Sequence, residues 1–158
     1  MIGGHPKHIL IHVRKKEEGD AFTQTNNYYD KFLHFCKTEG ITPILIGAKN
    51  ITLPKDIECI DLRGLNTLTL ETMGYLISES KILLGNDSGF SGLKLYQQQK
   101  DKLLIMEHPR WSRSHWYFKA IGDKSNCLLL DARSNNDKII EEAIKEYYGQ
   151  PKILENKS

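Results

Sequence analysis

The stretch GNDSGFSG, residues 85–92, joins a short apolar run to a segment with helical character. Glycine backbone can approach a ligand closely, and the free N–H groups at the start of a helix favour an anion. Ser88 or Ser91 could donate a hydrogen bond to a phosphate, whereas Asp87 could accept one from a hydroxyl or an amine. The pattern therefore predicts either a phosphate-binding turn or an ordinary helix N-cap supplied by Asp87 or Ser88.

A second group of charged residues follows the first apolar run of the chain. Arg14, Lys15 and Lys16 could neutralise a diphosphate, and a guanidinium can bind phosphate oxygens in a bidentate manner. Acidic residues follow within the same segment, so a solvated charged loop is the alternative. Further along, residues 108–119 interleave cations, among them Arg110, with two tryptophans and a tyrosine. That composition is typical either of a nucleotide-binding surface or of rings that fill a core or an interface.

Several familiar sites are excluded by spacing. The serine of GNDSG falls one position late for the nucleophile elbow Gly-x-Ser-x-Gly, and the chain holds neither a Walker loop nor Gly-x-Gly-x-x-Gly. The three cysteines include no Cys-x-x-Cys pair, so we expect small core residues and no metal site. A formal charge of +2 gives no argument for a nucleic-acid partner.

Strand-like apolar runs alternate with helix-like segments along the chain. Predicted strands cover residues 8–13, 42–47, 57–62, 81–85, 102–107 and 126–131. Predicted helices cover residues 26–40, 67–80 and 135–149, with a further helix after Ser88. Helical spacing predicts that the first two helices bury Tyr28, Phe32, Phe35 and Cys36, and Leu70, Met73, Leu76 and Ile77.

This alternation predicts a three-layer α/β, Rossmann-like fold. Several strands are apolar without a break, as expected when helices cover both faces of a parallel sheet of about six strands. Ligands of such sheets bind beyond the carboxyl ends of the strands, and both polar segments above follow strands. We expect one domain over residues 1–150 and a frayed tail over residues 151–158.

Residues 61–96, DLRGLNTLTLETMGYLISESKILLGNDSGFSGLKLY, resemble the C-terminal, nucleotide-sugar-binding half of GT-B glycosyltransferases, most closely the heptosyltransferase family. The shared positions are Asp61, Leu62, Gly64 and Leu68, followed by Gly85, Asn86, Asp87, Ser88, Gly89 and Leu93. The resemblance implies that the Asp87–Gly89 turn holds the diphosphate and neighbouring sugar of a donor. It also implies that one of Arg14, Lys15 or Lys16 neutralises the phosphates, with the sugar nucleotide as substrate and no cofactor.

Two features separate this chain from the family. The family's histidine falls on Gly92 and its alanine on Lys94, and no catalytic base can be nominated. The segment HVRKKEEGD is also similar to the His-x-Arg motif of GDP-fucose-dependent fucosyltransferases, so the donor base and sugar stay open.

GT-B enzymes bind their acceptor on a second domain. The resemblance therefore implies a metal-independent glycosyltransferase that needs an acceptor domain or subunit, or self-association, with the isolated chain inactive. The alternative is a non-catalytic module that binds a nucleotide or nucleotide sugar. Because no apolar run is long enough for a membrane span or a signal peptide, we expect a cytoplasmic protein.

Overall fold

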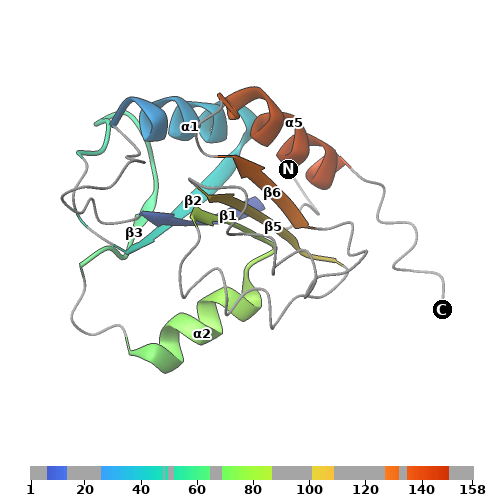
Figure 1. The fold of residues 1–158 in the computed structure, drawn as a ribbon. Helices are drawn as coiled ribbons and strands as arrows, with labels where there is room; N and C mark the ends of the chain where they lie inside the picture. The colour runs from blue at the N-terminus through green and yellow to red at the C-terminus, as the bar shows by residue number, and fades with distance from the viewer. Residues whose placement is uncertain are drawn as a thin grey trace, which may run out of the picture.

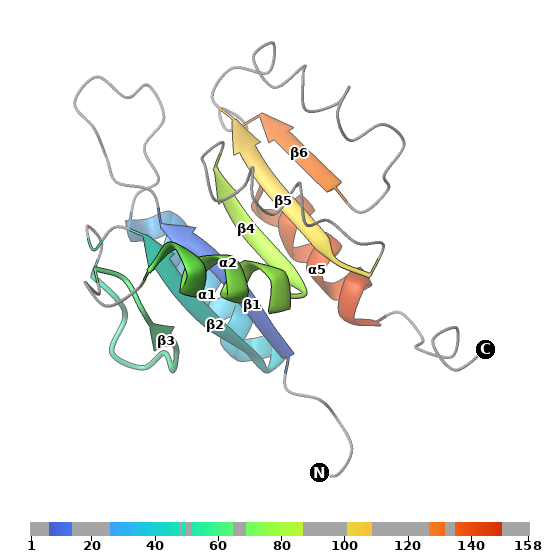
Figure 2. The same ribbon diagram turned by 90° about the horizontal axis from the view of Figure 1, so that it is seen from below.

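The structure is a computed structural model that describes residues 7–13, 26–47, 49, 52–64, 69–86, 101–108, 127–131 and 135–149. Its centre is a sheet of six parallel strands in the order β3-β2-β1-β4-β5-β6 (Figure 2). The strands are β1 (Lys7–Val13), β2 (Ile41–Gly47), β3 (Ile60–Asp61), β4 (Ile82–Asn86), β5 (Leu103–His108) and β6 (Cys127–Asp131). The predicted α/β, Rossmann-like architecture is confirmed.

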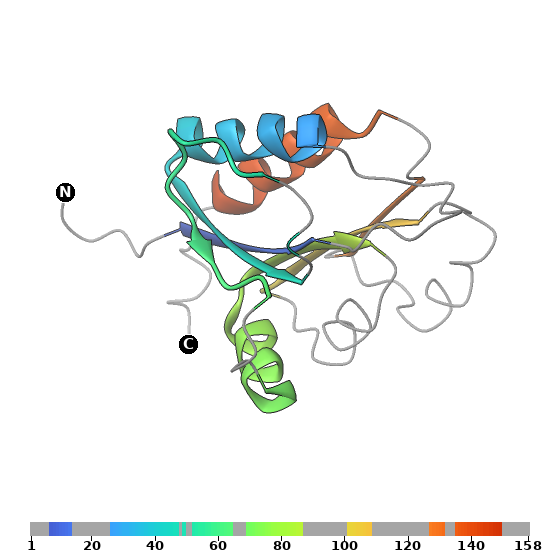
Figure 3. The ribbon, with the colours of Figure 1, turned by 90° about the vertical axis from the view of Figure 1, so that its left-hand side faces the viewer.

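Helices cover both faces of the sheet. Helices α1 (Asn26–Glu39) and α5 (Asp137–Gly149) lie on one face, and α2 (Leu70–Glu79) lies on the other (Figure 1). The edge-on view separates these layers clearly (Figure 3). The predicted helix after Ser88 and the tail at 151–158 lie outside the described residues.

The central strand shows why the sheet needs both layers. Ile9, Ile11 and Val13 enter the core under α1 and α5, whereas Leu10, between them, enters the core under α2. Successive strand side chains point to opposite faces, so an unbroken apolar run is buried only when both faces are covered. This is the pattern from which the sequence predicted a parallel sheet.

Helix α1 buries the face that its spacing predicts. Phe32, Phe35 and Cys36 are buried as expected, together with Tyr29 and Leu33, whereas the side chain of Tyr28 lies outside the described part of the structure. Gly40 ends the helix with φ of +69°, a left-handed conformation that glycine adopts without a Cβ clash.

Helix α2 corrects the prediction at one position. Met73 and Ile77 are buried and Leu76 is half-buried, but Leu70 is 76% exposed. The predicted helix started at residue 67, whereas α2 starts at Leu70 with Thr69 as its N-cap. Leu70 is therefore the first helical residue, one turn before the sheet-facing pair, and lies beyond the core that the pair enters.

Strand β3 is shorter than predicted. The apolar run suggested residues 57–62, but only Ile60 and Asp61 have strand geometry beside β2. Ile57 instead closes a turn through a bond from its N–H to the Pro54 carbonyl, at 3.4 Å. An edge strand has one neighbour, so its length is set by where that neighbour can pair with it.

Among the described helices, none combines the length and the apolar character that crossing a membrane requires.

Candidate functional site

The strand order reverses between β1 and β4. From β1 the chain adds β2 and then β3 on one side, and afterwards returns to add β4, β5 and β6 on the other side. Connections on either side of such a point leave in opposite directions, so a crevice forms outside the carboxyl ends of the two central strands. The carboxyl ends of β1 and β4 are therefore the first place to look for a ligand site.

The two polar segments nominated from the sequence follow these two strands. Strand β1 ends at Val13 and β4 ends at Asn86. The parallel register pairs Leu10 with Leu83 and Ile11 with Leu84, so two residues further on Val13 comes opposite Asn86. The chain thus leaves the sheet at adjacent points toward residues 14–16 and residues 87–89.

Asn86, the last residue of β4, is the one predicted site residue within the described part of the chain. The others lie outside the described residues: Arg14, Lys15, Lys16, Asp87, Ser88, Gly89, Ser91 and Arg110. The predicted aromatic surface at Trp111, Trp116 and Tyr117 also lies outside them.

A buried histidine stands at this edge. His12 is 8% exposed and pairs in register with Ile46 of β2. By strand alternation it shares with Leu10 the face covered by α2, and the β4 register brings the buried Gly85 beside it. An imidazole next to a residue without a side chain, at the point where the strand order reverses, can donate or accept a hydrogen bond there.

Gly47, at the end of β2, makes room for that imidazole. Its φ is +100°, and a Cβ built on it would lie 2.3 Å from the Val13 carbonyl oxygen and 2.8 Å from His12 Cδ2. Both the backbone conformation and the space therefore require glycine. Gly47 was not among the residues nominated from the sequence, and His12 was noted only as the first residue of the His-x-Arg segment; a histidine inside an apolar strand and a glycine at the end of the next strand were the available signals.

A buried arginine supports the end of β3. The Arg63 side chain is 2% exposed, and its Nε lies 2.9 Å from Asp61 Oδ1. Its Nη2 donates to Asp61 Oδ2 at 3.1 Å, and its backbone N–H donates to Oδ1 at 3.1 Å. Hydrogen bonds from Arg63 hold the pKa of Asp61 below its usual value, with a smaller contribution from the charge of Lys49. The resemblance of residues 61–64 to Asp-Leu-x-Gly drew attention to Asp61. Nothing in the sequence indicated that Arg63 would be buried, because arginine is normally an exposed residue.

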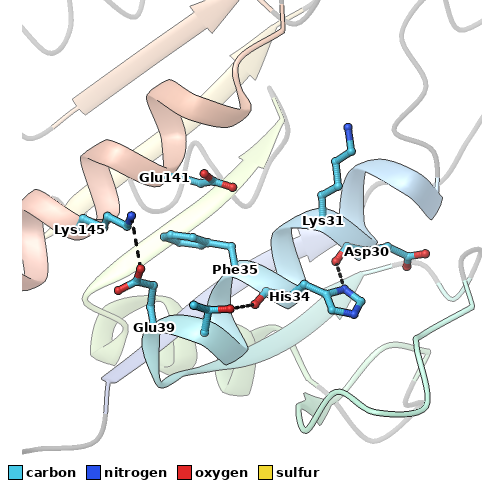
Figure 4. Close-up of a pocket in the computed structure, with 8 residues that line it drawn as sticks. Asp30, Lys31, His34, Phe35, Glu39, Glu141 and Lys145 are labelled. Carbon is cyan, nitrogen blue, oxygen red and sulfur yellow. Dashed lines mark hydrogen bonds and ion pairs between the residues drawn. The ribbon is translucent and has the colours of Figure 1, made fainter.

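A groove of about 510 Å³ lies elsewhere, between α1 and α5 (Figure 4). Phe35 lies between the two helices, and acidic and basic side chains surround it. Both lysines of the groove are within ion-pair range of acids, Lys145 at 3.4 Å from Glu39 and Lys31 at 4.0 Å from Asp137. Three acids and two lysines line the groove, so it carries no excess of positive charge and is the weaker candidate for an anionic ligand.

The chemistry available at the carboxyl edge is that of binding. The described residues there supply a buried imidazole, an ionised carboxylate held by Arg63, and the exposed ammonium of Lys49. No group of three or more His, Cys, Asp or Glu side chains that could hold a metal ion occurs among the residues that the structure describes. Comparison of the chain with protein-family models, with curated proteins and with solved structures finds no match.

Proposed function

We propose that the chain binds the nucleoside diphosphate part of a sugar nucleotide at the carboxyl ends of β1 and β4. In this proposal it is the donor-binding domain of a cytoplasmic, metal-independent glycosyltransferase. The observation that carries the proposal is the reversal of strand order between the two strands that lead into the cationic segment and into GNDSGFSG. Sites for nucleotides in open parallel sheets are found at such reversals.

The chemistry of the two segments supports an anionic ligand. Arg14, Lys15 and Lys16 follow β1 with three positive charges, and Ser88 and Gly89 follow β4 with a hydroxyl and a residue without a side chain. A diphosphate between adjacent strands, about 5 Å apart, would be within reach of both segments.

A second candidate function is binding without catalysis. Gly92 stands where the heptosyltransferase family has a histidine, and no general base can be nominated from the sequence. Transfer would then require a second acceptor domain or subunit, or association of two copies of this chain. A module that recognises a nucleotide sugar for regulation needs none of these.

A thermal-shift panel tests the binding proposal. The probes are ADP, GDP, UDP and CDP and their hexose conjugates. A ligand at one hundred times its Kd stabilises the native state by about 2.7 kcal/mol. For a chain of this length that corresponds to a rise in Tm of about 5–10 °C, expected for one base and larger for its sugar conjugate.

Variants locate the binding. Gly89→Val should abolish the rise, because a branched side chain would block backbone approach to the phosphate. Ser88→Ala should reduce it modestly, through the loss of one hydrogen bond. Ser78→Ala is the matched control, because the Ser78 hydroxyl donates to the Tyr75 carbonyl within α2 and should not affect binding.

Two outcomes would change the conclusion. If no nucleotide at millimolar concentration moves the Tm, GNDSGFSG is an ordinary capped turn and the proposal fails. If a sugar nucleotide binds, release of nucleoside diphosphate by the purified chain separates the two functions. We expect release to be absent or very slow, and turnover at ordinary enzymatic rates would favour a complete enzyme over a binding module.

A further inference from the structure

The turns that follow β2 and β3 are held together at the carboxyl edge. Leu62 N–H donates to the Leu45 carbonyl at 2.9 Å, and Gly64 N–H donates to the Gly47 carbonyl at 3.3 Å. Gly64 has φ of +68°, so the chain turns sharply as it leaves this pairing. The ladder between the two strands therefore continues past Asp61 and fixes one turn against the other.

The Asp61–Arg63 pair joins the end of β3 to the turn that follows it. Burial of a guanidinium is unfavourable unless its charge is compensated. Arg63 uses Nε, Nη2 and its backbone N–H on the one carboxylate, so both oxygens of Asp61 are engaged. A ligand that approached this edge would meet a carboxylate that is ionised and fixed in orientation.

Lys49 lies on the outer side of the same two turns. Its Cβ and Cδ are 3.6 and 3.8 Å from the position that a Cβ of Gly64 would take, so its stem runs past the glycine. Its side chain is exposed, and its charge lowers the pKa of Asp61. Within the described ranges the structure gives Lys49 no ion pair, and Asp61 is paired with Arg63.

We propose that Lys49 is a further contact for a phosphate group of the ligand and that the Asp61–Arg63 pair positions it. The inference rests on the proposed function. Strand β2 is the neighbour of β1, so the end of β2 lies about 5 Å from the end of β1, where Arg14–Lys16 begin. Gly64 follows β3, so the stem of Lys49 lies on the β2–β3 side of the crevice, and in this proposal its ammonium meets the phosphate from that side.

Lys49 and Arg63 have different roles in this proposal, because one charge is exposed and the other is buried. Arg63 is buried and committed to Asp61, so it contributes by holding the turn and not by touching the ligand. Lys49 has a stem supported by Gly64 and an ammonium in solvent, which is the arrangement of a side chain that can meet an incoming anion.

Titration calorimetry with inorganic pyrophosphate tests the inference without knowledge of the base. Lys49→Ala should weaken pyrophosphate binding by about threefold to tenfold at low salt, which is the usual range for one exposed charge-assisted contact. The difference should shrink as sodium chloride is raised from about 50 to 500 mM. Lys55→Ala is the matched control: Lys55 is also exposed, but it adjoins Asp56, which binds Lys37 in the last turn of α1 at the opposite end of the sheet.

A double-mutant cycle tests the positioning role. Arg63→Lys keeps the charge but loses the two-pronged hydrogen bond to Asp61. It should weaken pyrophosphate binding about threefold in the native chain and leave it unchanged in the Lys49→Ala background. A purely structural role would lower the Tm equally in both backgrounds and give no coupling in affinity.

The outcomes distinguish this inference from the proposal on which it rests. If neither pyrophosphate nor any nucleotide binds the native chain, the proposed function fails and the inference fails with it. If they bind and Lys49→Ala binds pyrophosphate as tightly as the native chain, the proposed function stands and the role of Lys49 is wrong. If Arg63→Lys acts equally in both backgrounds, Lys49 binds the anion but the pair does not position it.

Discussion

The two ends of the sheet satisfy their polar groups in different ways. At the amino end, α5 brings two tyrosines back to the strands: the Tyr148 hydroxyl donates to the His8 carbonyl and the Tyr147 hydroxyl to the Asp101 carbonyl. Lys81 pairs with Asp101 at 2.8 Å, and Lys7 lies 5.6 Å from the centre of the Tyr148 ring. Each of these contacts joins two elements of the chain itself.

At the carboxyl end, two glycines take conformations and positions that a side chain would not allow or would crowd. Gly47 and Gly64 both have positive φ, and the ring of His12 occupies the place of the missing Gly47 side chain. Lys49 is exposed above these turns. Contacts at the amino end therefore join elements of the fold to one another, whereas the carboxyl end combines the Asp61–Arg63 pair with the exposed side chain of Lys49.

The largest effect is expected for Gly47→Ala. A side chain there is strained by φ of +100° and would overlap the Val13 carbonyl oxygen at 2.3 Å, so β1, β2 or the His12 ring must move. Strain and overlap together should cost about 4 kcal/mol of unfolding free energy and abolish any nucleotide-induced rise in Tm. Denaturant unfolding and the thermal-shift panel measure the two losses.

Gly74→Ala is the control for a glycine that the fold does not require. Gly74 lies within α2, and a Cβ on it would meet nothing within 4 Å. The change should stabilise the protein by about 0.5–1 kcal/mol, because alanine is the better helix former. If Gly47→Ala were equally harmless, the close packing of His12 against β2 would be wrong.

Much of the fold could be predicted because strands that are buried on both faces are apolar at nearly every position. The runs at Ile9–Val13 and Leu103–Met106 are apolar at every position but His12. Helix α1 repeats its buried residues at helical spacing and ends at Gly40. Such signals are local, and a single sequence contains them.

The site could be predicted only in part, because its geometry depends on which strands become neighbours. The sequence located polar segments after strands, but it did not state that β1 would lie beside β4. Nor could it show that Arg63 would be buried, because the compensating carboxylate is recognised only once the turn has formed. Leu70 was expected inside the core because it lies at helical spacing from Met73 and Ile77, but as the first residue of α2 it lies beyond that buried pair.

The Asp61–Arg63 pair gives the next largest effect, and the two partners should differ. Asp61→Ala leaves a buried guanidinium without its main counter-charge and should cost about 3 kcal/mol. Arg63→Met should cost less, about 1–2 kcal/mol, because the 29% exposed carboxylate can turn to water. Equal costs for the two changes, measured by denaturant unfolding, would contradict this account of the burial.

The same pair predicts a response to acid. The pKa of Asp61 is lowered in the folded state, so its contribution to stability is present above the unfolded value of about 4 and is lost as pH falls through the folded value. The native chain should therefore lose more stability than Arg63→Met below pH of about 4. Melting curves between pH 7 and pH 3 measure this, and parallel curves would show that Arg63 does not shift the titration.

The smallest effect belongs to the amino end, with Tyr148→Phe. The change deletes the hydrogen bond to the His8 carbonyl and should cost about 1 kcal/mol, or 2–4 °C in Tm, with no change in nucleotide or pyrophosphate affinity.

Burial raises the pKa of Tyr148 to about 12. The folded state thus favours the neutral phenol, and this contribution is present below the unfolded pKa of about 10 and disappears as pH rises through 12. The native chain should lose more stability than the variant between those values, and ultraviolet titration should show a late-ionising tyrosine that the variant lacks. A loss of ligand affinity in Tyr148→Phe at unchanged stability would mean that the two ends of the sheet are coupled, and the division of roles between them would be wrong.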